Sequence, residues 1–238
     1  MRVAGLYDVH GNLPALEAVL ADVEREHVDL IVFGGDVAAG LLPAETIERL
    51  MEIGDARFVM GNADRILVEL FDGAGGSEEG LIDAWCAAQL DRRHRDFLAS
   101  FEPNVVVGDV CICHATPHSD EAIFTRITPD DRVRELMGEV AQDVVVCGHT
   151  HMQFDRTVDG IRIVNAGSVG MPYGTTDACW ALVDGTDVEL RRTPHDLEAA
   201  AERLRGSGHS MRERLIAENV LASPPAEEVT AFFESQAS

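Results

Sequence analysis

The 238-residue sequence contains no lysine, so all 19 of its basic residues are arginine. They are outnumbered by 42 acidic residues, which gives the chain a formal net charge of −23. A surface this acidic repels phosphate backbones, so broad binding to nucleic acids is not expected. The negative electrostatic potential of this surface also repels anionic small molecules. An anion bound here therefore needs metal ions or nearby arginines to offset its charge.

Long apolar runs and paired cysteines are also missing. No apolar run is long enough to span a bilayer, and the chain starts with a strand-like segment instead of a signal peptide. None of the five cysteines forms a CxxC pair, and three lie in apolar strand-like runs, where a free thiol behaves as a small hydrophobic group. We therefore expect no membrane association and a cytoplasmic location, where thiols stay reduced.

The length is compatible with a single α/β domain with a large core. In the first half, strand-like runs alternate with helical patterns such as residues 12–23, which predicts parallel strands joined by helical crossovers. In the second half, Asp159-Gly160 and Asp184-Gly185 predict hairpins between β-rich runs. A parallel half followed by antiparallel hairpins fits two sheets stacked face to face, with helices outside.

The expected boundaries are one domain over residues 1–222 and a loosely ordered tail at 223–238. Residues 194–222 are expected to form C-terminal helices, with a break near Gly206. Residues 71–104 interrupt the alternation of strands and helices with a glycine-rich loop and one or two helices. This segment is either an insertion near the site or a helical crossover.

Most of the polar residues of interest follow apolar, strand-like runs. Five short segments each contain a side chain that can bind a metal ion: Asp8-Val9-His10, Gly35-Asp36, Gly61-Asn62, His114 and Gly148-His149-Thr150-His151. Ligands collect at the carboxyl ends of strands in α/β sheets. Carboxylates, an amide oxygen and imidazoles without a thiolate suit Mn²⁺, Fe or Zn²⁺. A carboxylate such as Asp36 can bridge two ions, which catalytic pairs hold about 3.5–4 Å apart.

The ordered pattern D-x-H, GD, GN, H and G-H-x-H over residues 8–151 resembles that of the calcineurin-like metallophosphoesterases. A glycine-rich turn at 165–170 is similar to that of the small bacterial, phosphodiesterase-like members, so the resemblance covers about residues 1–192. It implies a four-layer αββα sandwich of two mixed β-sheets flanked by helices. It also implies two metal ions, one held by Asp8, His10, Asp36 and His151 and the other by Asp36, Asn62, His114 and His149.

The sequence departs from the family pattern directly after Asn62. Many members have a histidine there, which is assigned the role of proton donor to the leaving group, followed by an acidic residue. This chain has Ala63 and Asp64. Asp64 is therefore expected to cap a helix at residues 65–71. General acid catalysis is worth about 10²–10⁴-fold, and its loss penalises alkyl monoesters most and acidic diesters or phosphoanhydrides least.

Other polar residues near these segments are candidates for substrate contacts. His118 can donate a proton to the substrate or lie on a solvated loop. Arg65 and Arg126 can grip a phosphate bidentately or form surface ion pairs. Tyr173 is a candidate for lining the pocket, and Asn165 for ordering the neighbouring histidine loop.

Together these features predict a dinuclear-metal-dependent phosphoesterase that hydrolyses phosphodiesters by attack of a hydroxide bridging the ions. Asp36, Asn62 and His118 are the candidate catalytic residues. The two alternatives are a hydrolase of phosphoanhydrides such as dinucleoside polyphosphates, and a non-catalytic scaffold of the same fold that binds a protein partner. The expected cofactors are two divalent ions, Mn²⁺ or else Fe or Zn²⁺, and the expected partner is a small phosphorylated substrate. The oligomeric state stays open.

Overall fold

The computed structural model describes residues 1–74 and 81–236. Its strands are β1 (Arg2–Leu6), β2 (Leu30–Phe33), β3 (Ala56–Phe58), β4 (Asn104–Val107), β5 (Val110–Cys113), β6 (Val144–Cys147), β7 (Phe154–Val158), β8 (Ile161–Asn165), β9 (Ala178–Asp184) and β10 (Asp187–Thr193). Its helices are α1 (Leu13–Glu26), α2 (Pro43–Met51), α3 (Asn62–Phe71), α4 (Leu81–Gln89), α5 (Arg92–Leu98), α6 (Asp130–Met137), α7 (Leu197–Arg205), α8 (Arg212–Asn219) and α9 (Ala226–Gln236). None of these helices is both long enough and apolar enough to cross a membrane.

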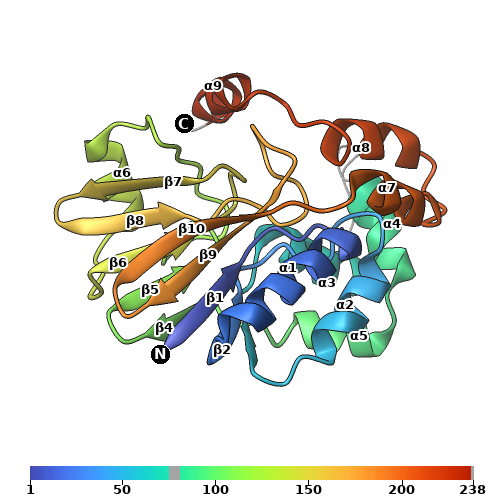
Figure 1. The fold of residues 1–238 in the computed structure, drawn as a ribbon, viewed down its shortest axis with the longest axis horizontal. Coiled ribbons are helices and arrows are strands. Elements are labelled where there is room, and N and C mark those ends of the chain that lie inside the picture. Colours follow the sequence, from blue (N-terminus) through green and yellow to red (C-terminus); the bar gives the residue numbers. More distant parts are fainter. Residues whose placement is uncertain (75–80, 237–238) are drawn as a thin grey trace.

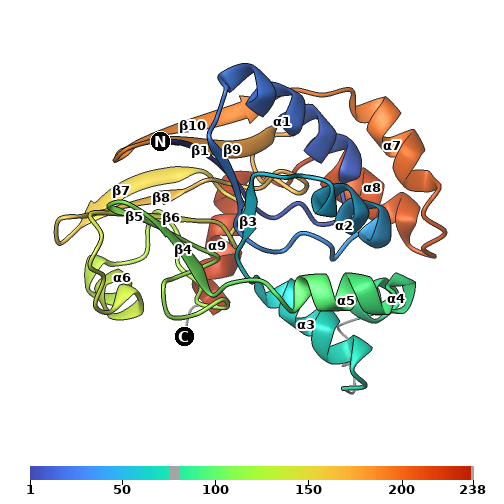
Figure 2. The same ribbon diagram turned by 90° about the horizontal axis from the view of Figure 1, so that it is seen from below.

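In the described part of the chain, the strands form two mixed five-stranded sheets, in the orders β10-β9-β1-β2-β3 and β4-β5-β6-β8-β7. Strands β1, β2 and β3 are parallel, as are β5, β6 and β8, and the remaining strands pair antiparallel. Both expected hairpins are present, with turns at Asp159-Gly160 and Gly185-Thr186. The sheets lie face to face with helices outside (Figures 1 and 2). The predicted sandwich of two mixed sheets is therefore confirmed.

Three apolar layers hold the sandwich together. The layer between the sheets is rich in valine and includes the fully buried Tyr7. The outer face of the first sheet packs against α1 and α2, where Leu16 and Ile47 are fully buried. Helix α6 covers the outer face of the second sheet with Val133 and Met137 (Figure 2). The elements therefore form the order helix, sheet, sheet, helix.

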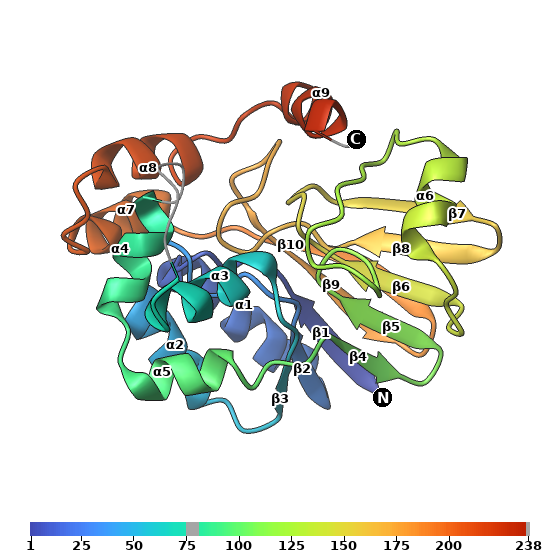
Figure 3. The ribbon, with the colours of Figure 1, turned by 180° about the vertical axis from the view of Figure 1, so that it is seen from behind.

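The segment at 71–104 contributes α4 and α5, which pack on α3 and α2 instead of adding a strand. Helices α4, α7 and α8 gather at one end of the molecule (Figures 1 and 3). The C-terminal helices break where the sequence predicts, because α7 ends at Arg205 and α8 begins at Arg212. Most of the predicted glycine-rich loop, residues 75–80, lies outside the described residues.

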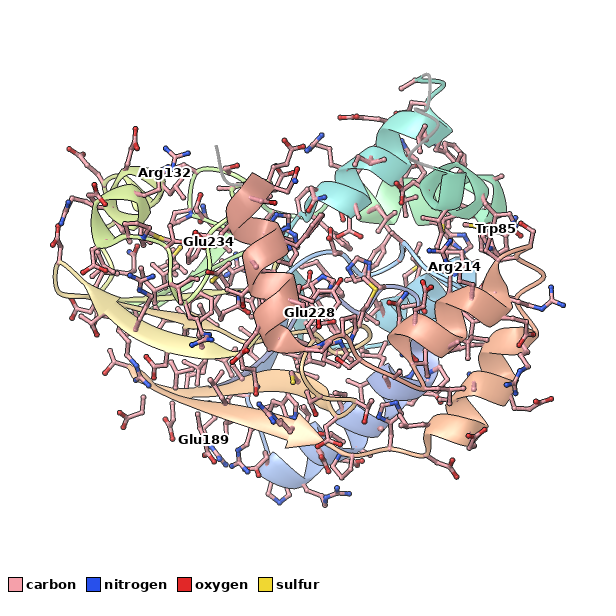
Figure 4. All side chains as sticks on the ribbon, turned by 90° about the horizontal axis from the view of Figure 1, so that it is seen from above. Trp85, Arg132, Glu189, Arg214, Glu228 and Glu234 are labelled. Carbon is pink, nitrogen blue, oxygen red and sulfur yellow. The ribbon has the colours of Figure 1, made fainter. Side chains whose placement is uncertain are left out.

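Two expectations about local structure are wrong. The helix expected at 65–71 begins at Asn62, so Asp64 lies in its first turn and accepts a hydrogen bond from the backbone N–H of Gly61 at 3.4 Å. The expected loose tail instead forms α9, which carries Glu228 and Glu234 (Figure 4). The hydroxyl group of Thr125 donates to the Glu234 carboxylate at 2.5 Å, which fixes α9 to a loop of the second sheet.

A buried hydrogen bond of the Tyr7 side chain joins the two sheets. The hydroxyl group of Tyr7 donates to the backbone carbonyl of Val146 in β6 at 2.8 Å. We expect Tyr7→Phe to lower the free energy of unfolding by about 1 kcal/mol, the usual net value of one such bond. Urea denaturation of the chelator-treated protein measures this loss. Tyr173→Phe is the matched control, because the Tyr173 hydroxyl bonds to no described residue, and equal stability of both variants with the unaltered protein would contradict the prediction.

Candidate metal centre

Seven polar side chains converge where strands of both sheets end. Asp8 and His10 follow β1, Asp36 follows β2, and Asn62 opens α3 just after β3. From the second sheet, His114 follows β5, and His149 and His151 follow β6. Six of them form two groups whose ligand atoms lie within 4.8 Å of one another: Asp8, His10 and His151 in the first, and Asp36, His114 and His149 in the second.

In the first group, two imidazole lone pairs face each other. His10 Nδ1 lies 3.0 Å from the carbonyl oxygen of Ala39, and His151 Nδ1 lies 2.9 Å from that of Met171. A carbonyl only accepts, so each Nδ1 carries the hydrogen and each Nε2 is left with a lone pair. The two Nε2 atoms are 3.1 Å apart. The Oδ1 atom of Asp8 lies 3.5 Å from His151 Nε2 and has no hydrogen-bond partner.

The second group repeats this arrangement. His114 Nδ1 lies 2.8 Å from the carbonyl oxygen of Gly34 and therefore carries a hydrogen, which leaves Nε2 as the atom that can bind a metal ion. His114 Nε2 lies 3.1 Å from Asn62 Oδ1. The Nε2 atom of His149 is buried without a hydrogen-bond partner. Opposed acceptors and orphaned buried atoms are costly unless a cation lies between them. Both groups therefore fit a divalent metal ion bound by nitrogen and oxygen.

The carboxylate of Asp36 lies between the two groups. Its Oδ1 accepts a hydrogen bond from the backbone N–H of Ala63 at 2.8 Å. Its Oδ2 lies 3.8 Å from His10 Nε2 and 3.4 Å from His114 Nε2. One oxygen is thus fixed by the protein, while the other is near a ligand of each group. This is the arrangement that a bridging carboxylate needs.

The backbone at these positions is strained. In the described part of the chain, seven residues other than glycine have positive φ, and five of them are Asp8, His10, Asp36, His149 and His151. A residue other than glycine in this conformation costs of the order of 1–3 kcal/mol, and such residues cluster at functional sites. The sequence is therefore folded to aim these side chains, at a cost in local conformational energy.

The backbone at Gly61 packs closely against the Asp36 carboxylate. A Cβ at Gly61 would lie 2.2 Å from Asp36 Oδ1, so only glycine fits beside this carboxylate. Asp64 does more than cap α3, because its carboxylate also accepts the backbone N–H groups of Asp36 and Val37 at 2.7 and 2.9 Å. It thereby holds the strained turn after β2. Burial, together with the negative charge of Asp36, raises the pKa of Asp64 to about 7.

The pKa values of the two histidines in the second group are shifted in opposite directions. Burial alone would lower the pKa of His114, but the adjacent Asp36 carboxylate raises it to about 10. Burial and the positive charge of His114 lower the pKa of His149 to about 4. Burial would raise the pKa of Asp36, yet His114 holds it well below its usual range. The metal-free second group therefore contains one protonated and one neutral imidazole.

Buried polar residues fix the loops that carry the ligands. Asn165 donates to the carbonyl of Gly148 at 2.6 Å and to the hydroxyl of Thr150 at 3.1 Å, which ties β8 to the histidine loop as the sequence suggests. Ser168 donates to the carbonyl of Asp8 at 2.7 Å. Its role is visible only in the structure, because a serine in a glycine-rich turn has no distinctive spacing.

Two of the predicted substrate contacts are already engaged elsewhere. The guanidinium group of Arg65 forms ion pairs with Asp120 at 2.8 Å, with Glu121 and with Glu69. His118 is exposed, and its Nε2 lies 3.2 Å from the carbonyl oxygen of Glu139, next to α6. The ion pairs of Arg65 match the surface alternative. His118 also lines, together with His114, a pocket of about 240 Å³, so its role as proton donor stays a prediction.

Tyr173 and Arg126 line the same pocket beside α9. The ring of Tyr173 stacks on that of His151, with centroids 5.2 Å apart. Arg126 is exposed and lines, together with Tyr173 and Arg192, a separate pocket of about 110 Å³ beside α9. Tyr173 therefore touches a candidate ligand, whereas Arg126 lines a different hollow.

Comparisons with known proteins are consistent with this geometry. The family model of the calcineurin-like phosphoesterase superfamily domain matches residues 1–187. An uncharacterised protein of Methanocaldococcus jannaschii is 26% identical over 232 residues, which cover 85% of this chain and 91% of the relative. A metallophosphoesterase structure from Sphaerobacter thermophilus is 25% identical, with a TM-score of 0.73 over 91% of this chain and 97% of that one. A hypothetical protein from Pyrococcus horikoshii, 17% identical, shares the fold with a TM-score of 0.76 over 93% and 99% of the two chains.

The geometry predicts the metal content of the purified protein. Two groups of ligands should bind two divalent ions per chain, and His149→Ala should retain only about one, because it weakens a single group. Elemental analysis after dialysis measures this ratio. His118→Ala serves as the control and should keep two ions, since His118 lies outside both groups. One ion or fewer in the unaltered protein would contradict the dinuclear site.

The pKa values predict how metal binding depends on pH. His114, with a pKa of about 10, is protonated at pH 8 in the metal-free protein, and a ligating imidazole must be neutral. Loading at pH 8 should therefore release about one proton per chain from this residue, and affinity should rise with pH toward 10. His149, with a pKa of about 4, should release none. Calorimetric titration with Mn²⁺ in buffers of different ionisation enthalpy measures the release; a value near zero would contradict the assignment.

Proposed function

The chain belongs to the calcineurin-like phosphoesterase superfamily, and we propose that it is a dinuclear-metal-dependent phosphodiesterase. The observation that supports this most strongly is the position of Asp36 Oδ2 between two groups of buried nitrogen and oxygen atoms, 3.8 Å from His10 Nε2 in one and 3.4 Å from His114 Nε2 in the other. Two metal ions about 3.5–4 Å apart are the usual catalytic arrangement for in-line displacement at phosphorus.

The residues have defined roles in this proposal. Asp8, His10 and His151 hold one ion, Asn62, His114 and His149 hold the other, and Asp36 bridges them. When bound, the two ions supply an activated water and offset the charge on the phosphoryl oxygens. We infer Mn²⁺, Fe or Zn²⁺ from the donor set, which has no thiolate.

The position after Asn62 offers no imidazole to protonate the leaving group. Ala63 presents a methyl group beside the centre, and its N–H is already bonded to Asp36. His118 faces Glu139. Without an acid here, good substrates are esters whose leaving groups are stable as anions. This favours diesters of acidic alcohols over alkyl monoesters.

Two other functions are compatible with the fold. A phosphoanhydride hydrolase also needs no acid, because its leaving group is a phosphate. A protein-binding scaffold would retain the sandwich and use the metals only for stability. Metal-dependent turnover of any phosphodiester separates both enzyme hypotheses from the scaffold. We further propose that the substrate is small and that the protein is cytoplasmic, since its five cysteines are buried and free.

The absence of an acid predicts the dependence of rate on the leaving group. Bis(p-nitrophenyl) phosphate should be hydrolysed faster than glycerol phosphate, and rates should fall steeply as leaving-group pKa rises. Ala63→His should help poor leaving groups by less than about ten-fold, well below the full general-acid factor. The reason is that Asp64, the only acid beside it in sequence, is committed to the N–H groups of Asp36 and Val37. Steady-state rates over an ester series measure both effects, and a flat dependence in the unaltered enzyme would reveal another donor.

Asp36→Asn tests the bridging role. Removing one negative charge shared by both ions should lower kcat for bis(p-nitrophenyl) phosphate by at least about 10³-fold, more than loss of a ligand from one group. Asp120→Asn, which changes a carboxylate on the surface partner of Arg65, is the control and should keep most activity. Comparable activity of both variants would count against a bridging carboxylate.

A further inference from the structure

A largely apolar pocket opens beside the first metal-binding group. Its volume is about 300 Å³, and His10 and Ala63 form the wall nearest the metal ligands. Ile82 of α4, Leu204 of α7 and Leu215 of α8 form much of the remaining wall. These three helices meet at the same end of the molecule, as Trp85 on α4 and Arg214 on α8 illustrate (Figure 4). The pocket is therefore built from segments outside the two sheets.

The polar groups of this pocket are few, and two of them are free. Both polar atoms of Asn12 already form hydrogen bonds, because its Nδ2 donates to the Gly170 carbonyl at 2.9 Å and its Oδ1 accepts from the Ala15 N–H at 3.3 Å. The side chains of Asp83 and Asn219 face the pocket without a hydrogen-bond partner among the described residues. Among the described residues that line the pocket, Asp83 is the only one with a carboxylate, and none is an arginine.

We propose that this pocket receives one ester group of the substrate, an uncharged and mainly apolar organic group that donates a hydrogen bond to Asp83. The inference rests on the proposed phosphodiesterase function and narrows its substrate class. A volume of about 300 Å³ is at the lower limit of small-molecule sites, which suits a single ring or nucleoside. The phosphodiester itself would lie over the metal ligands, since His10 belongs to both the site and the pocket wall.

The charge of Asp83 argues against an anionic group in the pocket. Burial and the nearby Asp36 raise the pKa of Asp83, so its surroundings already disfavour negative charge. A second phosphate would enter an apolar space next to a carboxylate, and no arginine among the described lining residues would offset its charge. The pocket therefore favours a phosphodiester with an organic group over a dinucleoside polyphosphate. A hydrogen-bond donor of the substrate satisfies the carboxylate instead.

The test compares p-nitrophenyl diesters that differ only in the second ester group, which is methyl, phenyl, thymidine-5′-yl or a carboxylate-bearing alkyl group. The measured quantity is kcat/KM relative to the methyl ester, for the metal-loaded enzyme. We expect the phenyl and thymidinyl esters to exceed the methyl ester by about ten-fold or more, because a filled apolar pocket gives discrimination of this size. The phenyl and thymidinyl arms distinguish a purely apolar group from one that also donates a hydrogen bond.

Three substitutions localise the preference. Leu215→Trp fills the pocket and should remove the advantage of the large esters. Asp83→Asn, nearly isosteric, should lower the thymidinyl-to-phenyl ratio and improve the relative rate of the carboxylate-bearing ester. Glu218→Gln on α8, whose carboxylate is exposed and paired with Arg214, is the matched control and should change none of these ratios.

A binding measurement on the same variants tests the pocket independently of catalytic activity. Thymidine alone should bind to the chelator-treated protein, and calorimetric titration should show its affinity reduced in Leu215→Trp and Asp83→Asn but not in Glu218→Gln. Failure of the unaltered enzyme to hydrolyse any of the diesters would overturn the proposed function itself. Turnover with the same ratios in all variants, or a carboxylate-bearing ester preferred by the unaltered enzyme, would overturn the pocket assignment alone.

Discussion

Buried hydrogen-bond acceptors that face one another are the constraint on which this structure depends. The carbonyls of Ala39 and Met171 occupy the Nδ1–H groups of His10 and His151, and so direct two lone pairs at each other across 3.1 Å. Burial makes such an arrangement unfavourable without a cation. The protein therefore contains a place where positive charge lowers the energy of the fold, and both groups of candidate ligands are built from residues that follow strands of the two sheets.

The rest of the molecule can be understood as support for that arrangement. Strained backbone after β1, β2 and β6 aims the ligands, and Asp64 holds the turn after β2 by accepting two backbone N–H groups. The sandwich core and the Tyr7 hydrogen bond keep the two sheets in register, so that their strand ends stay together. Stability and metal binding are consequently coupled, since binding to the folded state alone stabilises it.

The sequence predicted the parts of the structure that depend on local pattern. Strand-end position and spacing pointed to the seven residues that converge, because each of these candidate ligands follows a strand within a few residues. Six of them form the two groups. The rest depends on packing between distant segments. Nothing in the spacing shows that Asp64 reaches Val37, that Arg65 is paired with Asp120, or that Asp83 faces the pocket beside His10. Helix α9 was missed because its anchoring contact, Glu234 with Thr125, joins residues far apart in the chain.

In the proposed metal centre, two ions bind side by side with Asp36 between them. Crystals grown with Mn²⁺ and measured at its absorption edge test this directly, because each ion gives its own anomalous peak. We expect two peaks about 3.5–4 Å apart. One should lie between His10 and His151 and the other between His114 and His149, with both in contact with Asp36. A single peak, or two peaks that do not share Asp36, would contradict it.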